Sequence, residues 1–147
     1  MEDLSNKTLI CWAEIYEHIQ SIHLQTQKND AGLIAIIGIS RGGLVPAVIL
    51  SEYKNSYIYS IGIKAQEQII YQNINKSELN NFKTIYLIDD ICDSGRTFKY
   101  ATKELNNLNY KTIYLLYRPN NIYKPDYYAK EIKKDWIIFP WEMKLTT

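Results

Sequence analysis

The sequence has almost no net charge, only two cysteines and no long apolar run. Its 147 residues carry 17 Lys and Arg against 16 Asp and Glu, a formal charge of +1. This balance provides neither the basic field typical of nucleic-acid binding nor the acidic excess typical of disorder. Cys11 and Cys92 have no metal-ligand spacing and cannot build a disulfide framework. We therefore expect a cytoplasmic protein without a nucleic-acid partner.

Membrane, targeting and multidomain features are also lacking. The apolar segments are shorter than a membrane span, and the N-terminus MEDLSNKTLI is acidic where a signal peptide is basic. No repeat, low-complexity tract or linker interrupts the chain, so we expect one domain over residues 1–147. His18 and His23 lie five apart within a predicted helix, and we interpret them as surface or packing residues, not ligands.

Apolar segments alternate with segments of helical periodicity. Three helices are predicted, from about Cys11 to Gln25, from Pro46 onward, and around Phe98 to Leu105. Four strands are predicted at Leu33 to Ile39, Tyr57 to Ile63, Thr84 to Asp89 and Thr112 to Tyr117. This alternation predicts an α/β fold, a parallel-stranded sheet flanked by helices. We expect Lys64 to Asn81 to be a long loop, and the aromatic tail from Tyr127 to Thr147 to be irregular but folded over another part of the chain.

The segment TIYLIDDICDSGRT, Thr84 to Thr97, places two adjacent carboxylates directly after a strand. Asp89 and Asp90 repel each other, so folding alone would not select them, and Asp93 follows three residues later. The backbone N–H groups of the turn behind them, aimed by a helix N-terminus, suit a phosphate. The carboxylates suit sugar hydroxyls or a divalent cation. The segment therefore predicts a sugar phosphate with vicinal hydroxyls and a bound metal, against the alternative of a solvated acidic turn.

A second loop, SRGGLVPA, follows the strand that ends at Ile39. Its paired glycines allow the backbone to approach an anion, and the guanidinium of Arg41 matches phosphate oxygens. Alone, a Gly-Gly pair after a strand is usually only a turn. Ligands of parallel sheets bind outside the carboxyl ends of the strands, so we expect the two loops to form one site. Lys64, after the next strand, is either a further anion contact or a solvated lysine.

Together these motifs resemble the type I phosphoribosyltransferases. The resemblance implies transfer of a 5-phosphoribosyl group from phosphoribosyl pyrophosphate (PRPP), with Mg²⁺ as cofactor and Asp90 as its ligand. It also implies that Asp93 is catalytic and manages the proton at purine N7. The PRPP-binding residues that it implies are Arg41, Gly42, Asp89, Asp90, Asp93, Ser94, Gly95, Arg96 and Thr97.

The tail DWIIFPWEM resembles that of the short bacterial xanthine-guanine phosphoribosyltransferases within this family. The resemblance implies a small C-terminal base-binding hood in which Trp136 stacks on the purine and the backbone of Ile137 reads its edge. Ile91 would pack on the opposite face, and Asp93 would lie near N7. Arg118 stands where the family has a lysine that donates to the 6-oxo group, so a 6-oxopurine (guanine, xanthine or hypoxanthine) stays the expected substrate. Purine salvage by a homodimer or homotetramer is implied.

Three other interpretations of the function, and one of the two tail tryptophans, remain open at this point. The fold could serve a nucleotide-sensing regulator without catalysis, although the near-neutral charge disfavours an RNA-binding one. Orotate or adenine could be the acceptor of the phosphoribosyl group, but the sequence of the tail argues against both. An unrelated α/β protein such as a phosphatase could also present an acidic pair, but it gives no reason for SRGG. Trp136 and Trp141 could instead be core anchors of the tail.

Overall fold

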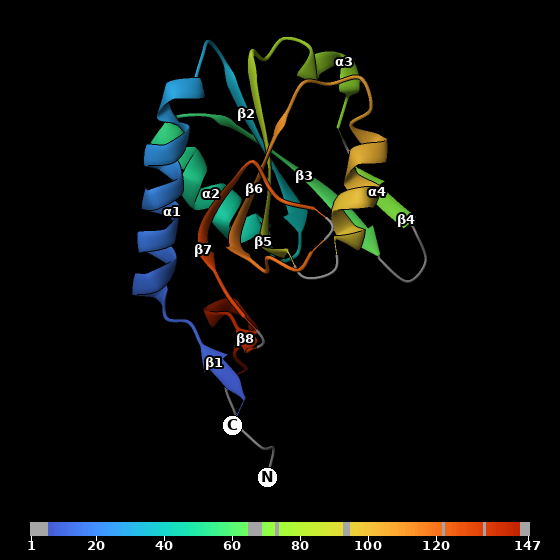
Figure 1. Cartoon of the computed structure of the whole chain (residues 1–147). Helices are drawn as coiled ribbons and strands as arrows, with labels where there is room; N and C mark the ends of the chain where they lie inside the picture. The colour runs from blue at the N-terminus through green and yellow to red at the C-terminus, as the bar shows by residue number, and fades with distance from the viewer. Residues whose placement is uncertain are drawn as a thin grey trace.

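A six-stranded sheet with helices on both faces forms the body of the molecule (Figure 1). The computed structural model describes residues 6–64, 69–72, 74–92, 95–121, 123–133 and 135–144. The sheet order is β4-β3-β2-β5-β6-β7, and every neighbouring pair is parallel except β3 with β4. The strands are β2 (Ile34–Ser40), β3 (Tyr57–Lys64), β4 (Ile69–Gln72), β5 (Thr84–Cys92), β6 (Lys111–Tyr117) and β7 (Tyr127–Glu131). The predicted α/β class is confirmed.

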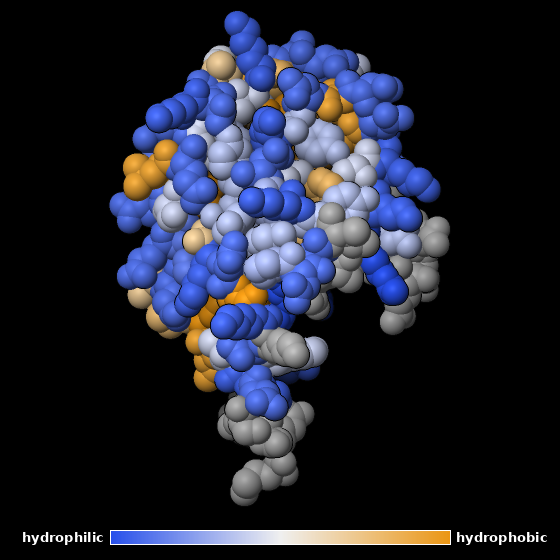
Figure 2. Space-filling model, viewed as in Figure 1, coloured by the Kyte–Doolittle hydropathy of each residue, from blue (hydrophilic) through white to orange (hydrophobic). Residues whose placement is uncertain are grey.

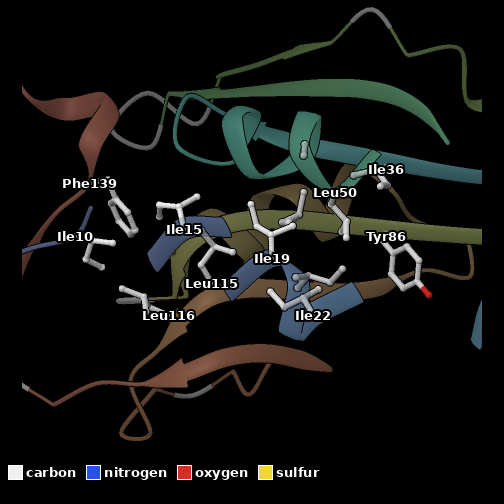
Figure 3. Close-up of a cluster of buried hydrophobic side chains, with 13 residues drawn as sticks. Ile10, Ile15, Ile19, Ile22, Ile36, Leu50, Tyr86, Leu115, Leu116 and Phe139 are labelled. Carbon is white, nitrogen blue, oxygen red and sulfur yellow. The ribbon is translucent and has the colours of Figure 1, made fainter. Parts of the chain in front are cut away.

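Two apolar cores lie on the two faces of the sheet. One packs α1 (Trp12–Thr26) and α2 (Leu44–Lys54) against the sheet, and Figure 3 shows the isoleucines of α1 pointing into it. The other packs α4 (Arg96–Glu104) and the short α3 (Lys76–Leu79) against the opposite face. Successive strand residues alternate between these cores, with Ile36 in the first and Ile37 in the second. This two-sided burial explains the continuous apolar runs.

The predicted helices and most predicted strands lie within one or two residues of their observed bounds. Helix α2 begins at Leu44, two residues before the predicted start at Pro46. Proline is tolerated there because the first turn of a helix does not use its N–H groups. Asn55 ends the helix with a φ of 47°, in the left-handed region that asparagine tolerates better than most residues. None of the helices in the described ranges is long and apolar enough to cross a membrane.

The prediction of a long loop from Lys64 to Asn81 was wrong. Strand β4 pairs antiparallel with β3, with Lys64 opposite Ile69, and α3 follows it. The short β-branched and aromatic run Ile69-Ile70-Tyr71 has strand propensity, and it extends the edge of the sheet. Residues 65–68 and 73 lie outside the described ranges.

The tail is also more regular than predicted. Strand β7 joins the main sheet, and β8 (Trp136–Ile138) pairs in parallel with β1 (Lys7–Leu9) near the N-terminus. A 3-10 turn, η2 (Pro140–Glu142), follows β8. We call β1, β8 and η2 the hood. It lies below the main sheet in Figure 1, on the side toward which β2 and β3 point. The expectation that the aromatic tail folds over another part of the chain is confirmed.

Strand β5 is longer than predicted, because it continues past Asp89 to Cys92. Ile91 and Cys92 stay in register with Leu116 and Tyr117 of β6. The acidic pair is therefore part of the strand, and is not in the loop behind it.

A polar network is buried near the amino ends of the strands. The ammonium of Lys54, whose side chain is fully buried, lies 2.6 Å from the carboxylate of Asp30. The hydroxyl of Tyr86 donates to the same carboxylate at 2.6 Å, and the Lys54 ammonium lies 5.3 Å from the centre of its ring. Burial raises the pKa of Tyr86 above its ordinary value, so it stays a donor.

Replacing Asp30 with alanine should destabilise the fold, because it leaves the Lys54 charge and the Tyr86 hydroxyl without their acceptor. We expect a loss of about 3 kcal/mol in the free energy of unfolding, measured by urea titration. Lys28→Ala, at an exposed position just before Asp30, is the matched control and should change little. Equal stability of Asp30→Ala and the control would contradict this account of the network.

Candidate active site

The two motifs at the strand ends are in direct contact. Strand β2 pairs in parallel with β5, so the SRGG turn leaves the sheet beside the acidic pair. A Cβ atom placed on Gly42 would overlap the Asp90 carboxylate, and one on Gly43 would overlap the carbonyl oxygen of Ile88. Both glycines are thus required by close approach of the two segments. The prediction that the two loops share one edge of the sheet is confirmed.

The acidic pair lies at this edge, with one carboxylate buried and the other half-buried. Asp89 is 8% exposed and Asp90 is half-buried. The Asp89 carboxylate accepts a hydrogen bond from the backbone N–H of Asp90 at 2.9 Å, and the Asp90 carboxylate accepts one from Ile91 at 2.7 Å. Among the described residues, neither carboxylate has a lysine or arginine within ion-pair distance. Within the described ranges, the negative charge is therefore concentrated without a lysine or arginine beside it.

Burial raises the pKa of both carboxyl groups. For Asp89 the second cause is the neighbouring charge of Asp90. For Asp90, burial raises the pKa to about 6, and the carboxylate of Glu142 adds to the shift. Perturbed carboxyl groups in a cleft are typical of functional sites, because the energy that they cost the free protein is recovered when a cation or donor binds.

A divalent cation fits this donor set. No cluster of three or more His, Cys, Asp or Glu side chains occurs in the described part of the chain, so no cage of protein ligands alone is formed there. Mg²⁺ in phosphate sites typically takes only one or two carboxylates and completes its shell with ligand oxygens and water. Two neighbouring carboxylates of raised proton affinity, one of which (Asp90) lines a cleft, match that requirement.

A cleft of about 750 Å³ separates the SRGG turn from the hood. Arg41, Gly42 and Asp90 line one side. Glu142 and Lys144 line the other, and sequence reasoning missed both because they reach this cleft only through the position of the hood. In Figure 2 the molecule becomes narrower from the body down to the hood. The volume is in the range of small-molecule sites.

The predicted phosphate turn runs from the end of β5 into α4. Asp93 and Ser94 lie outside the described residues. Gly95 is buried with a φ of 77°, which only glycine adopts without strain, and α4 begins directly after it. Arg96 is exposed and Thr97 half-buried in the first turn of α4. The N–H groups of this turn have no partner four residues back in the helix, which makes the helix start suitable for an anion.

The predicted purine contacts are divided between β5 and the hood. Trp136 is 67% exposed on β8, and its backbone N–H donates to the carbonyl of Asn6 at 3.0 Å. Ile137, next to it, and Ile91 of β5 both pack against the same buried cluster. An exposed indole anchored through its backbone is available for a flat ring.

Trp141 has a different role from Trp136. It stacks on buried Phe139, with ring centres 4.7 Å apart and an interplanar angle of 6°. Its ring also lies 6.0 Å from that of Trp12 on α1. Trp141 is thus a packing anchor of the hood, as the alternative interpretation expected for it, whereas Trp136 is not.

Arg118 is engaged with the tail in a way that the sequence did not reveal. One terminal nitrogen of its guanidinium donates to the carbonyl of Lys133, and the other donates to the carbonyl of Asp135 at 2.8 Å. A lysine has one nitrogen and could not bridge two carbonyls with the fixed geometry of a guanidinium. Arg118 therefore holds the segment that leads into Trp136.

Comparisons with known proteins agree with this geometry. Residues 9–147 match the family model described as phosphoribosyl transferase domain. A xanthine-guanine phosphoribosyltransferase of Cereibacter sphaeroides is 31% identical over 147 residues, covering 92% of this chain and 87% of the relative. The enzyme of the same name from Idiomarina loihiensis is 29% identical, with 92% and 87% covered.

Solved structures show the same fold. A purine phosphoribosyltransferase from Pyrococcus horikoshii Ot3 superposes with a TM-score of 0.78 at 26% identity, covering 97% of both chains. The xanthine-guanine-hypoxanthine phosphoribosyltransferase of Helicobacter pylori gives a TM-score of 0.78 at 21% identity, covering 92% of this chain and 93% of the other. With the paired strand-end motifs, these matches show that the chain belongs to the phosphoribosyl transferase domain family.

Proposed function

We propose that this protein is a purine salvage enzyme that transfers the 5-phosphoribosyl group of PRPP to a 6-oxopurine and releases pyrophosphate. Guanine, xanthine and hypoxanthine are the candidate acceptors. One observation carries the proposal: the Gly42 backbone contacts the Asp90 carboxylate at the carboxyl ends of adjacent strands. The names of the relatives, at 29–31% identity, support the same chemistry.

PRPP would lie across both strand ends. Its pyrophosphate would meet Arg41 and the backbone of Gly42, and its ribose hydroxyls would donate to Asp89 and Asp90. Its 5′-phosphate would be held by the turn from Asp93 through Ser94, Gly95 and Arg96 to Thr97, at the start of α4. The ligand would thus be bound by cationic and amide donors at its phosphates and by carboxylates at its hydroxyls.

Asp90 is the proposed Mg²⁺ ligand, with Asp89 holding the neighbouring hydroxyl. When bound, the metal supplies positive charge that offsets the charge on the departing pyrophosphate. Arg41, exposed at the edge of the cleft, adds a second positive charge on the same side. Electrostatic assistance of this kind acts on the bond that breaks between ribose and pyrophosphate.

The purine would be held between Trp136 and Ile91, with the backbone of Ile137 at its edge. Asp93 is the proposed catalytic residue, and it would accept or hold the proton at purine N7 while N9 attacks the anomeric carbon. Arg118 bridges the carbonyls before Trp136. Its guanidinium carries only donors, and it is the proposed partner of the 6-oxo group. An amino group at position 6, as in adenine, would oppose these donors.

The proposed setting is the cytoplasm, and the proposed unit is one domain spanning residues 1–147. Both cysteines are thiols, which agrees with a reducing compartment. A homodimer or homotetramer is also proposed, supported by the exposed apolar side chains of Val48 on α2 and Tyr57 and Ile58 on β3. The regulator alternative receives no support from the relatives, which are named as transferases.

A purine panel tests the proposal directly. The protein is mixed with PRPP, Mg²⁺ and one of guanine, xanthine, hypoxanthine or adenine, and nucleotide and pyrophosphate are quantified. We expect nucleotide with at least one 6-oxopurine and none with adenine, because Arg118 offers only donors at position 6. Chelation of the metal should stop the reaction.

Binding of purine nucleotides without consumption of PRPP, whatever purine is supplied, would favour the regulator and contradict the enzyme. Turnover with adenine and with none of the 6-oxopurines would still show phosphoribosyl transfer. It would contradict the purine-binding roles proposed for Arg118 and the hood.

Asp90→Asn should lower the enzymatic activity without lowering the stability of the folded protein. The variant loses the proposed metal ligand, so nucleotide synthesis should fall by at least about a hundredfold. The pKa of Asp90 is raised in the folded state, so its charge costs folding stability above that pKa and the cost disappears as the pH falls through it. The melting temperature of the ligand-free variant should therefore exceed that of the wild type near about pH 8, and the difference should vanish near about pH 4.

Glu52→Gln, at an exposed position on α2, is the matched control and should show neither effect. A variant at Asp90 that is less stable than the wild type at high pH would show that the carboxylate serves the fold, contrary to this account.

A further inference from the structure

The connection between β6 and β7 reaches back to the predicted phosphate turn. The side-chain amide of Asn121 donates to the sulfur of Cys92 at 3.3 Å. A Cβ atom on Gly95 would lie 2.9 Å from the amide oxygen of Asn121 and 2.7 Å from the ring of Tyr123. Cys92 and Gly95 are the two residues that flank Asp93 and Ser94 in the chain. Asn121 therefore contacts both ends of the turn.

Asn121 is itself held firmly. Its backbone N–H donates to the carbonyl of Arg118 at 3.1 Å, which closes a tight turn. Its side-chain oxygen accepts a hydrogen bond from the backbone N–H of Tyr123 at 3.3 Å. The ring of Tyr123 packs on Phe98 of α4, with ring centres 5.0 Å apart. The backbone N–H and the side-chain oxygen of Asn121 are thus both hydrogen-bonded, and its amide nitrogen donates to Cys92.

The same short connection begins at Arg118, which bridges the carbonyls of Lys133 and Asp135 in the tail. One end of the connection therefore holds the segment before Trp136, and the other end holds the turn behind the acidic pair. A turn whose ends are already fixed loses less conformational entropy when its N–H groups bind an anion. It therefore binds the anion with higher affinity.

We propose that Asn121 is a positioning residue for the 5′-phosphate of PRPP, acting through Cys92 and Gly95 without touching the purine. The inference rests on the proposed function, and it deepens that function by assigning a role to a residue outside both motifs. Of the proposed purine contacts, Ile91, Ile137 and Trp136 lie on β5 and the hood. The contact of Asn121 with Arg118 uses the Asn121 backbone N–H, which Asn121→Ala keeps. Loss of the Asn121 amide should therefore raise the KM for PRPP and leave the KM for the purine nearly unchanged, whereas a change in the proton role proposed for Asp93 would appear in kcat.

Asn121→Ala is the test, with KM measured separately for PRPP and for guanine or whichever 6-oxopurine the wild type uses. The KM for PRPP should rise about tenfold, the size of one lost hydrogen bond with a buried partner, while the KM for the purine stays within about twofold. Asn120→Ala, at the exposed neighbouring position of the same turn, is the matched control and should change neither. Melting temperatures report whether each variant is folded.

Cys92→Ala removes the sulfur that accepts the Asn121 hydrogen bond, and it should give the same selective rise in the KM for PRPP. If the two side chains act through one contact, the double variant should be no worse than the more impaired single variant. Cys92→Ala alone decides the matter should Asn121→Ala not fold.

Three results overturn the inference: equal rises in both KM values, no rise in either, or full additivity in the double variant. A wild-type protein that makes no nucleotide from PRPP with any purine instead overturns the proposed function, and the inference with it.

Discussion

The burial of two neighbouring carboxylates at the end of β5 is the constraint on which the site depends. Asp89 and Asp90 stay in the strand, satisfied by backbone N–H groups, while the Gly42 backbone packs directly on the Asp90 carboxylate. Burial raises the pKa of both groups, so the free protein carries an electrostatic cost at neutral pH. Under the proposed function, a ligand with hydroxyls and a cation would remove this cost on binding.

The rest of the molecule places complementary groups around that pair. The parallel pairing of β2 with β5 brings the SRGG turn alongside, and the start of α4 directs N–H groups to the same edge. The hood lines one side of the cleft, and it is held there because β8 pairs with β1 and because Trp141 stacks on Phe139 and lies against Trp12 of α1. Segments from both ends of the chain are therefore needed to complete one site.

Local sequence signals predicted the sheet and the two motifs, because each of these features depends on residues that follow one another in the chain. The apolar runs of β2, β5 and β6 reflect burial on both faces, and the Gly-Gly pair reflects close approach to Asp90. The missed features depend on distant partners instead. Strand β8 forms only against β1, Arg118 bridges carbonyls of the tail, and Asn121 meets Cys92 across the fold. No periodicity or spacing within one segment encodes such contacts.

In the proposed complex, one ligand spans the two strand ends. A crystal structure of the protein with PRPP and Mg²⁺ tests it most directly. The pyrophosphate should lie beside Arg41 and Gly42, the ribose hydroxyls and the metal at Asp89 and Asp90, and the 5′-phosphate at the start of α4. Electron density for PRPP at any other edge of the sheet, with the acidic pair left in contact with solvent alone, would contradict it.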